Sequence, residues 1–274
     1  MSLPFTIADV FTDQPLAGNQ LAVFLDAGDI DERLLQPIAR EIGFSETVFV
    51  LPGDVIRIFT PSVELPFAGH PVLGTAFVLA SQRGAGLVKL QTGRGEVPVV
   101  FEGANGRRGR MSQPLPAVSP WTGDHDELFG ALGVDGSLQP VDQYDNGPRY
   151  LYVVVADDEA VSSLAPDLGR LANAIGMAGV SCAAGRGTEW KCRMFAPGLG
   201  VAEDPATGSA AGPLAVHLCR HGLVPWGTEI TITQGVELRR PSTLYATAHG
   251  DDDRLVAVEV AGDTVVIGRG SLEL

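Results

Sequence analysis

The sequence predicts an α+β protein of two similar domains, each a curled, mostly antiparallel sheet around a central apolar helix. The first observation is a glycine loop that occurs twice, in residues 64–75 and 202–213, each time followed by small and apolar residues that suit a buried helix. The second is spacing, because Gly69 and Gly208 lie 208 − 69 = 139 positions apart in a chain of 274 residues. This spacing indicates a duplicated unit with one glycine loop per copy facing a shared cleft.

A third observation supports the duplication. A strand-like run precedes each glycine loop and carries an arginine, a phenylalanine and a proline at the same spacing. These residues are Arg57, Phe59 and Pro61 in the first copy and Arg193, Phe195 and Pro197 in the second. The strand, the loop and the helix are therefore repeated together.

The first half alternates short strands with two helices. Helical spacing of apolar residues predicts a helix over 31–42, which ends at Gly43, and a second helix, apolar all round, over 70–81. Gly18 and Asn19 form a turn between the first two strands. The predicted strands are 5–11, 21–25, 47–51, 55–60, 87–91, 96–101 and 107–112.

Residues 113–120 mark the domain boundary, because three prolines in eight residues disfavour both a helix and a strand ladder. We expect an N-terminal domain over 1–115, which the last strand, 263–274, can rejoin, and a C-terminal domain over 116–262. The predicted helices of the second half are 124–132, 167–175 and 209–221. Its predicted strands are 150–156, 179–183, 188–195, 229–234, 244–249, 254–260 and 264–269.

The composition limits the classes of partner. With 45% hydrophobic residues and a mean hydropathy of +0.16, the chain can bury one large core or two ordinary ones. Its formal net charge is −14 and its isoelectric point is about 4.7, with the charges scattered along the chain. Such a surface repels phosphate backbones and anionic membranes, so we expect neither nucleic acid nor a membrane as a partner.

The cysteines and the amino-terminal residues favour a cytoplasmic location for the protein. Cys182, Cys192 and Cys219 form an odd, unclustered set that is typical of reduced thiols. Residues 1–6 lack the basic and apolar regions of a secretory signal, and no apolar run approaches the roughly 20 residues that a membrane helix needs. A cytoplasmic protein is expected.

The two glycine loops favour anion binding. The first N–H groups of a helix lack partners within the helix and carry partial positive charge, so an anion gains hydrogen bonds there. Gly69 and Gly208 allow close approach of a ligand, and His70 and Ser209 add side-chain donors. Two such helix ends would hold a small carboxylate. The alternative is that each glycine only begins a tightly packed buried helix.

Three residues are candidates for moving protons. Glu46 lies where a helix gives way to an apolar strand; if it faces the cleft, partial desolvation should raise its pKa toward the range of a general base. Asp204 is the second candidate, and His70 could relay protons or donate to the substrate. The alternatives are a solvated turn carboxylate for Glu46, a loop cap for Asp204 and a satisfied loop histidine for His70.

Further motifs along the chain resemble one protein family. They are, in order, residues 9–19, 45–47, 64–74, 203–210, 234–235 and 240–242. Together they resemble the PhzF-like phenazine-biosynthesis family, relatives of diaminopimelate epimerase, over nearly the whole chain. The resemblance implies two domains of the diaminopimelate-epimerase fold, a homodimer, and cofactor-free isomerisation in the interdomain cleft.

The resemblance also implies roles for individual residues. Glu46 matches the acid/base glutamate of the family, and Gly69 and Gly208 match backbone donors to the substrate. His70, Asp204 and Ser209 match polar groups that line the substrate. We therefore predict a catalytic set and a substrate-binding set, which are Glu46, His70 and Asp204, and Asn19, Gly69, Gly208 and Ser209, respectively.

The chain departs from the family pattern at two positions. Gln20 stands where the family usually has proline, and Arg239 stands where glycine often precedes Arg-Pro-Ser; both could alter the substrate pocket. The epimerase relatives use one cysteine from each half as paired bases. Neither glycine loop here contains a cysteine, which disfavours a two-thiol racemase.

No metal or cofactor is predicted. His217 and His221 lie four residues apart on one helix face, a spacing that metal sites use, but the sequence offers no obvious third ligand, so helix packing is favoured. Residues 204–209 lack the lysine of a nucleotide-binding loop, and neither Lys89 nor Lys191 lies in a recognisable pyridoxal-phosphate setting.

These observations predict a cofactor-independent isomerase or epimerase that moves a proton on a small carboxylate substrate, with Glu46 as general acid and base. Domain closure would exclude water from the site. A binding or regulatory protein that keeps the cleft but has lost turnover is the alternative, since a pure binder would need only the glycine loops.

Overall fold

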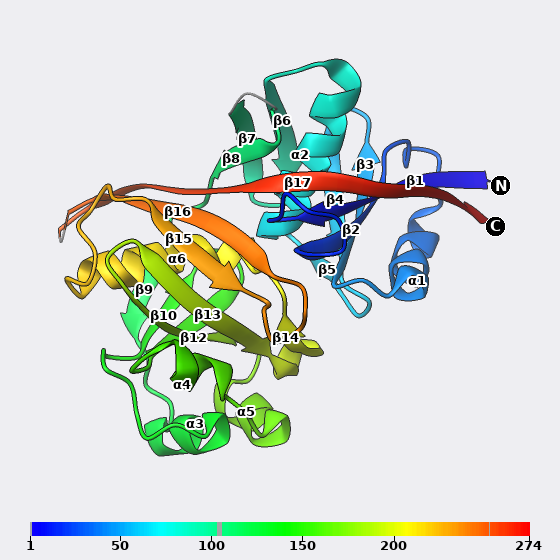
Figure 1. Cartoon of the computed structure of the whole chain (residues 1–274). Coiled ribbons are helices and arrows are strands. Elements are labelled where there is room, and N and C mark those ends of the chain that lie inside the picture. Colours follow the sequence, from blue (N-terminus) through cyan, green and yellow to red (C-terminus); the bar gives the residue numbers. More distant parts are fainter. Residues whose placement is uncertain (1, 103–105, 252) are drawn as a thin grey trace. The chain divides into compact units, whose positions relative to one another are not determined.

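The computed structural model describes residues 2–102, 106–251 and 253–274 and divides into two compact units. Unit 1 comprises Met1–Ser112 and Ala261–Leu274, and unit 2 comprises Gln113–Val260. Figure 1 labels their elements along the chain. The last strand, β17 (Leu255–Glu273), drawn in red, contributes residues to both units.

Unit 1 is a sheet whose pairings run round in a ring. Its other elements are β1 (Ser2–Val10), β2 (Asn19–Phe24), α1 (Glu32–Ile42), β3 (Glu46–Leu51), β4 (Val55–Phe59), β5 (Glu64–Leu65), α2 (Gly69–Arg83), β6 (Leu87–Thr92), β7 (Gly95–Glu102) and β8 (Arg108–Ser112). Strands β1, β2, β3, β4, β6, β7 and β8 pair in this order. Since β17 pairs with both β1 and β8, the sheet has the curl that the sequence predicts.

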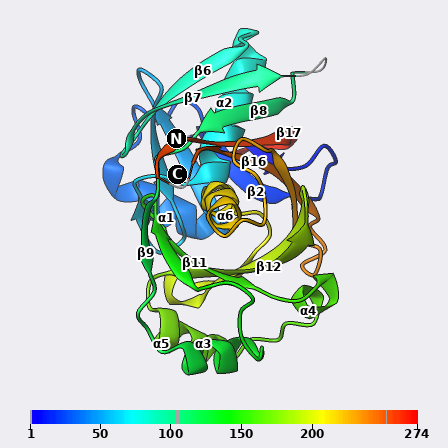
Figure 2. The ribbon, with the colours of Figure 1, turned by 90° about the vertical axis from the view of Figure 1, so that its left-hand side faces the viewer.

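Unit 2 has a comparable sheet. Its elements are β9 (Ala117–Pro120), α3 (His125–Leu132), β10 (Asp142–Asp145), β11 (Arg149–Val154), α4 (Asp158–Ser162), α5 (Leu168–Ile175), β12 (Gly179–Arg186), β13 (Glu189–Ala196), the 3-10 turn η1 (Pro197–Leu199), β14 (Val201–Asp204), α6 (Gly208–Arg220), β15 (Ile230–Gln234) and β16 (Ser242–Gly250). Figure 2 looks almost along α6 and shows β11, β12 and β16 around it.

The order of pairings is the same in the two units. In unit 1, β2 and β3 are parallel, β3 and β4 antiparallel, β4 and β6 parallel, and β6 and β7 antiparallel. Unit 2 repeats these directions. Strands β11 and β12 are parallel, β12 and β13 antiparallel, β13 and β15 parallel, and β15 and β16 antiparallel. Each unit also places a short strand, β5 or β14, directly before its central helix. The topology therefore repeats as the glycine loops do.

Two helices are buried on nearly every side. In α2 eleven residues of fifteen are buried, and in α6 twelve of thirteen. A helix that is apolar all round gains stability only when other elements cover every face, and the curled sheets do this. The predicted central helices over 70–81 and 209–221 are confirmed, with boundaries that differ by one or two residues.

The remaining helices cover the outside of the sheets with one apolar face. In unit 1, Leu35 and Ile38 of α1 pack with Phe24, Phe49 and Phe59. In unit 2, α3 and α5 pack over the sheet through a larger cluster that includes Leu128, Leu132, Leu171, Val153 and Phe195. Each unit thus has its own apolar core. Of the two options that the composition allows, one large core or two ordinary ones, the structure has the second.

Two predictions at the chain's junctions are wrong. Residues 117–120 form β9 and pair with β10, although the three prolines of residues 113–120 were expected to disfavour a ladder. Pro120 is the last residue of this short strand, where a missing N–H costs little. The predicted strands 254–260 and 264–269 are one strand, β17, because Gly262 makes no turn; its missing Cβ leaves room for the ring of Phe11.

Among the described helices, none combines the length and the apolar character that crossing a bilayer requires.

Candidate active site

Three of the predicted site residues lie together in unit 1. Asn19 is the first residue of β2, Glu46 is the first of β3, and His70 is the second residue of α2. Strands β2 and β3 are parallel, with Leu21 opposite Glu46, so both strands begin at one edge of the sheet. The fold therefore brings together side chains from three separate motifs.

A chain of polar contacts joins these residues. The Ser45 hydroxyl donates to Asn19 Oδ1 at 2.9 Å, and Asn19 Nδ2 lies 3.3 Å from His70 Nδ1. His70 Nε2 lies 3.5 Å from Glu46 Oε2. At 3.5 Å the two atoms approach closely but do not form a hydrogen bond, since His70 Nε2 has no hydrogen-bond partner among the described residues. Asn19 therefore holds the His70 ring beside Glu46.

Burial decides the charge of His70. Its side chain is 4% exposed, and desolvation lowers its pKa from 6.5 to about 3, a shift that a hydrogen bond to the backbone of Gln20 partly opposes. His70 is therefore neutral near pH 7 and lies beside the carboxylate without acting as its counter-ion. Glu46, 15% exposed, keeps an accessible portion.

In unit 2, Asp204 and Thr207 form the corresponding loop before α6. Thr207 Oγ1 donates to Asp204 Oδ2 at 2.6 Å. The Gln234 amide holds both residues, since Nε2 donates to the Asp204 carbonyl at 2.8 Å and Oε1 accepts from the Thr207 N–H at 3.2 Å. Gly235 has a φ of +75°, and a Cβ there would lie 2.5 Å from the Pro205 carbonyl oxygen. The Gln234-Gly235 motif therefore shapes the loop that carries Asp204.

The first turn of α6 is held by side chains from the rest of unit 2. The Ser209 hydroxyl shares a 2.6 Å hydrogen bond with Tyr150 Oη, and the Ser209 carbonyl accepts from Asn146 Nδ2 at 2.9 Å. The Gly208 carbonyl accepts from Gln113 Nε2 at 2.8 Å. These bonds fix the orientation of Ser209, whose hydroxyl can donate outward when Tyr150 donates to it.

The starts of α2 and α6 differ from those of the other four α-helices among the described residues. Helices α1, α3, α4 and α5 are all capped by an aspartate side chain, from Asp31, Asp124, Asp157 and Asp167. At α2 and α6 the capping residues, Ala68 and Thr207, make no side-chain cap hydrogen bond, and neither first turn contains an acidic residue. Both central helices therefore begin with an electrostatic preference for an external anion.

Six polar residues of these groups were not predicted as site residues. They are Ser45, Gln113, Asn146, Tyr150, Thr207 and Gln234. Gln234 belongs to a motif that the sequence analysis singles out, and Ser45 and Thr207 lie beside predicted residues, so a local signal existed. Tyr150 lies 59 positions from Ser209 and only the fold brings the two together.

The cysteines give no support to a thiol mechanism. All three are free and buried, and burial raises the pKa of Cys182 and Cys192 to about 12 and that of Cys219 to about 11. A thiolate base would need the opposite shift.

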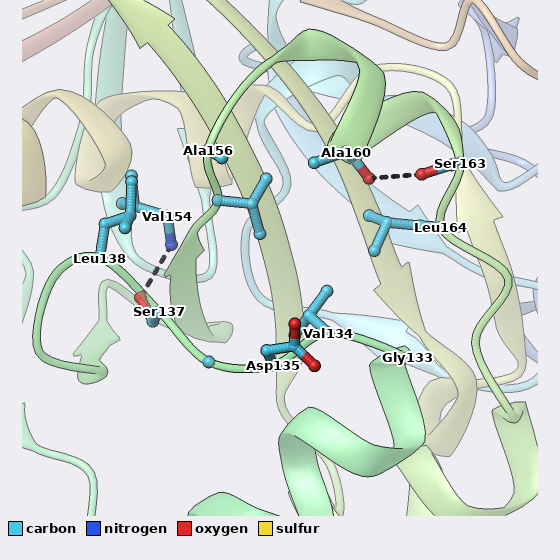
Figure 3. Close-up of a pocket in the computed structure, with 12 residues that line it drawn as sticks. Gly133, Val134, Asp135, Ser137, Leu138, Val154, Ala156, Ala160, Ser163 and Leu164 are labelled. Atoms are coloured by element: carbon cyan, nitrogen blue, oxygen red, sulfur yellow. Dashed lines mark hydrogen bonds between the residues drawn. The ribbon is translucent and has the colours of Figure 1, made fainter.

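A cavity of about 490 Å³ lies elsewhere in unit 2, between the segment after α3, the end of β11 and α4 (Figure 3). None of the predicted site residues lines it. Its two serine side chains bond within the protein, Ser137 accepting from the Val154 N–H and Ser163 donating to the Ala160 carbonyl. The cavity therefore offers no acid and base pair.

Comparison with known proteins gives a consistent family. The family model for phenazine biosynthesis-like proteins, PhzC-PhzF, matches residues 8–270. The trans-2,3-dihydro-3-hydroxyanthranilate isomerases of Pseudomonas chlororaphis and Pseudomonas aeruginosa are 47% and 45% identical, over 98% and 97% of this chain and 99% and 98% of theirs.

The solved structures agree. A PhzF-family protein of Bacillus anthracis superposes with a TM-score of 0.89 at 23% identity, covering all of both chains. A predicted epimerase of Pseudomonas aeruginosa reaches 0.83 at 33% identity over 98% of this chain and 99% of its own. The predicted fold class and the resemblance are confirmed: this chain belongs to the phenazine biosynthesis-like (PhzC-PhzF) family and is an isomerase that acts on a small molecule.

Proposed function

We propose that this isomerase moves a proton between two carbons of a small, carboxylate-bearing ring, with Glu46 as the base that removes the proton and the acid that returns it. The observation that carries the proposal is the contact of Glu46 Oε2 with His70 Nε2 at 3.5 Å. A neutral imidazole beside the carboxylate does not neutralise its charge, so Glu46 can act as a base.

The reaction conserves atoms and charge. Glu46 takes a proton from a carbon of the substrate, and the electron pair of that C–H bond enters the adjoining double-bond system. The double bond moves, and the protonated Glu46 returns the proton to a second carbon. A single base suffices when both carbons present the same face to it.

The substrate class follows from the helix ends and from the relatives. The starts of α2 and α6 favour an anion, and a carboxylate satisfies this preference. The named relatives act on trans-2,3-dihydro-3-hydroxyanthranilate, a ring that carries a carboxylate, an amino and a hydroxyl group. We infer the same compound or a close analogue for this chain.

Glu46→Gln tests the base. The amide keeps the size of the side chain but cannot accept the proton, so we expect turnover to fall by about 10²- to 10⁴-fold while substrate affinity stays within a few fold. The reaction is run in deuterated water with trans-2,3-dihydro-3-hydroxyanthranilate, and product formation and deuterium uptake are followed by mass spectrometry.

Glu41→Gln is the matched control, because Glu41 is an exposed glutamate of α1 and should leave turnover unchanged. Turnover retained by Glu46→Gln would remove Glu46 from the mechanism. The homodimer that the resemblance implies stays a prediction, which light scattering of the purified chain would test.

A further inference from the structure

A second polar cluster lies at the other end of α6. Asp142 of β10 and His217 and His221 of α6 each present one ligand atom, and these atoms lie within 4.8 Å of one another. The two histidines have the spacing that the sequence analysis noted, and the fold adds the third group that was missing there. Asp142 and His217 are buried, and His221 is partly exposed.

The contacts within the cluster leave one atom unsatisfied. His221 Nε2 lies 2.9 Å from Asp142 Oδ2, and His217 Nδ1 lies 3.1 Å from Tyr144 Oη. His217 Nε2 is buried and has no hydrogen-bond partner among the described residues, and the whole residue is inaccessible to solvent. A buried polar atom without a partner is costly, so this nitrogen calls for an explanation.

The cluster is separate from the proposed active site. His217 follows Ser209 by eight residues, which places it about 12 Å further along the helix axis. The carbonyl end of a helix carries partial negative charge and favours a cation, the opposite of the preference at Gly208. One helix thus has ends suited to ligands of opposite charge.

We propose that Asp142, His217 and His221 bind a divalent transition-metal ion, with Zn²⁺ as the best match. Two imidazoles and one carboxylate form a donor set that zinc accepts, with water at the fourth position. Ligand atoms around such an ion lie about 3 to 3.5 Å apart, so the cluster would contract by about 1 Å through side-chain rotation.

The surroundings of His217 fit this role. Metal-binding histidines usually donate the second ring N–H to an outer acceptor. Tyr144 Oη provides it, which leaves the lone pair on His217 Nε2 for the metal. The ion would fasten β10 to the end of α6.

Cobalt titration of the metal-stripped full chain tests the site. We expect Co²⁺ to bind with 1:1 stoichiometry and to give the visible absorption of a low-coordinate ion, which Zn²⁺ then displaces. Asp142→Asn and His221→Gln should each weaken binding by more than about 100-fold, and Tyr144→Phe, which removes only the outer acceptor, by about 10-fold to 100-fold. The measurement does not depend on isomerase activity.

His249→Gln is the matched control, because His249 also faces a carboxylate, Glu259 at 3.3 Å, but belongs to no such cluster among the described residues. It should bind as the wild type does. Thermal unfolding of each variant checks folding, and His221, 17% exposed, tolerates substitution better than its buried partners. The proposal is overturned if the wild type shows no saturable binding, or if His221→Gln, folded, binds as tightly as the wild type.

Discussion

The arginine that precedes each glycine loop makes two matching contacts in the two units, but in different surroundings. Arg57 forms a two-pronged ion pair with Glu64 at 2.8 Å and lies over the Phe59 ring. Arg193 pairs in the same way with Glu203, at 2.9 and 2.8 Å, and lies over Phe195.

The two pairs differ in sequence spacing and in burial. Arginine and glutamate are 64 − 57 = 7 residues apart in unit 1 and 203 − 193 = 10 apart in unit 2, where η1 takes up the extra length. The side chains are 25% and 42% exposed in the first pair but 9% and 11% in the second. The ion pair has the same geometry in both units despite these two differences, and it joins β4 to β5 and β13 to β14, where β5 and β14 are the strands before the glycine loops.

Substituting the two arginines should give the largest difference between the units. Arg193→Met leaves Glu203 buried without its partner and removes a donor from the carbonyls of Val161, Ser162 and Leu164, so we expect a loss of about 3–5 kcal/mol in the free energy of unfolding. Arg57→Met breaks a more exposed pair and should cost at most about 1 kcal/mol. Urea unfolding measures both, and equal losses would contradict the comparison.

The second difference lies at the second position of the central helix, which carries a titratable side chain in unit 1 but not in unit 2. His70 occupies the second position of α2, where α6 has Ser209, which does not titrate. The pKa of His70 is about 3 when folded and 6.5 in its ordinary state, so below pH 6.5 the unfolded chain binds the extra proton. The stability that neutral His70 provides is complete above pH 6.5 and is lost as the pH falls toward 3.

Comparing wild type with His70→Asn isolates this contribution. From pH 6.5 to pH 4.5 the wild type should lose about 2 kcal/mol more than the variant, in urea unfolding at each pH. His125→Asn, at an exposed histidine, should follow the wild type. If the free energies of unfolding of the wild type and His70→Asn fall equally with pH, His70 binds its proton as readily in the folded state as in the unfolded state.

The smallest expected change in stability comes from giving α2 the cap that it lacks. Ala68→Asp should stabilise the helix by about 1 kcal/mol or less, in the way that Asp157 caps α4. The new carboxylate would occupy the N–H groups proposed for the substrate, so the affinity for a carboxylate ligand should fall. Ala68→Asn adds a cap without charge and should weaken binding less. Unchanged affinity in Ala68→Asp, measured by calorimetry, would argue against an anion site at α2.

The sequence predicts the repeated parts of this fold because those parts depend on local signals. Helix α1 carries clear apolar spacing and ends at Gly43, and the two central helices follow conspicuous glycine loops. Strand β10, which supplies Asp142, was missed because its four residues, Asp-Gln-Tyr-Asp, alternate polar and aromatic groups over too short a run.

The sequence could predict which residues form the candidate site but not the contacts between them. Glu46, His70 and Asn19 were each identified from motifs, yet nothing local shows that Asn19 orients His70 or that Tyr150 holds Ser209. These contacts join residues 51 and 59 positions apart, and only the pairing of strands decides them. Asp142, the third member of the cluster with His217 and His221, could not be predicted for the same reason.

The long strand β17 has a consequence for how the chain folds during synthesis. Its final residues pair with the first strand, Ser2 opposite Glu273, so the sheet of unit 1 closes through residues that are synthesised after the whole of unit 2. Unit 2 is continuous in sequence and can form as soon as residue 260 has emerged. The half of the molecule that is made first is therefore the half that finishes folding second, and until then its β1 and β8 edges remain without their last partner.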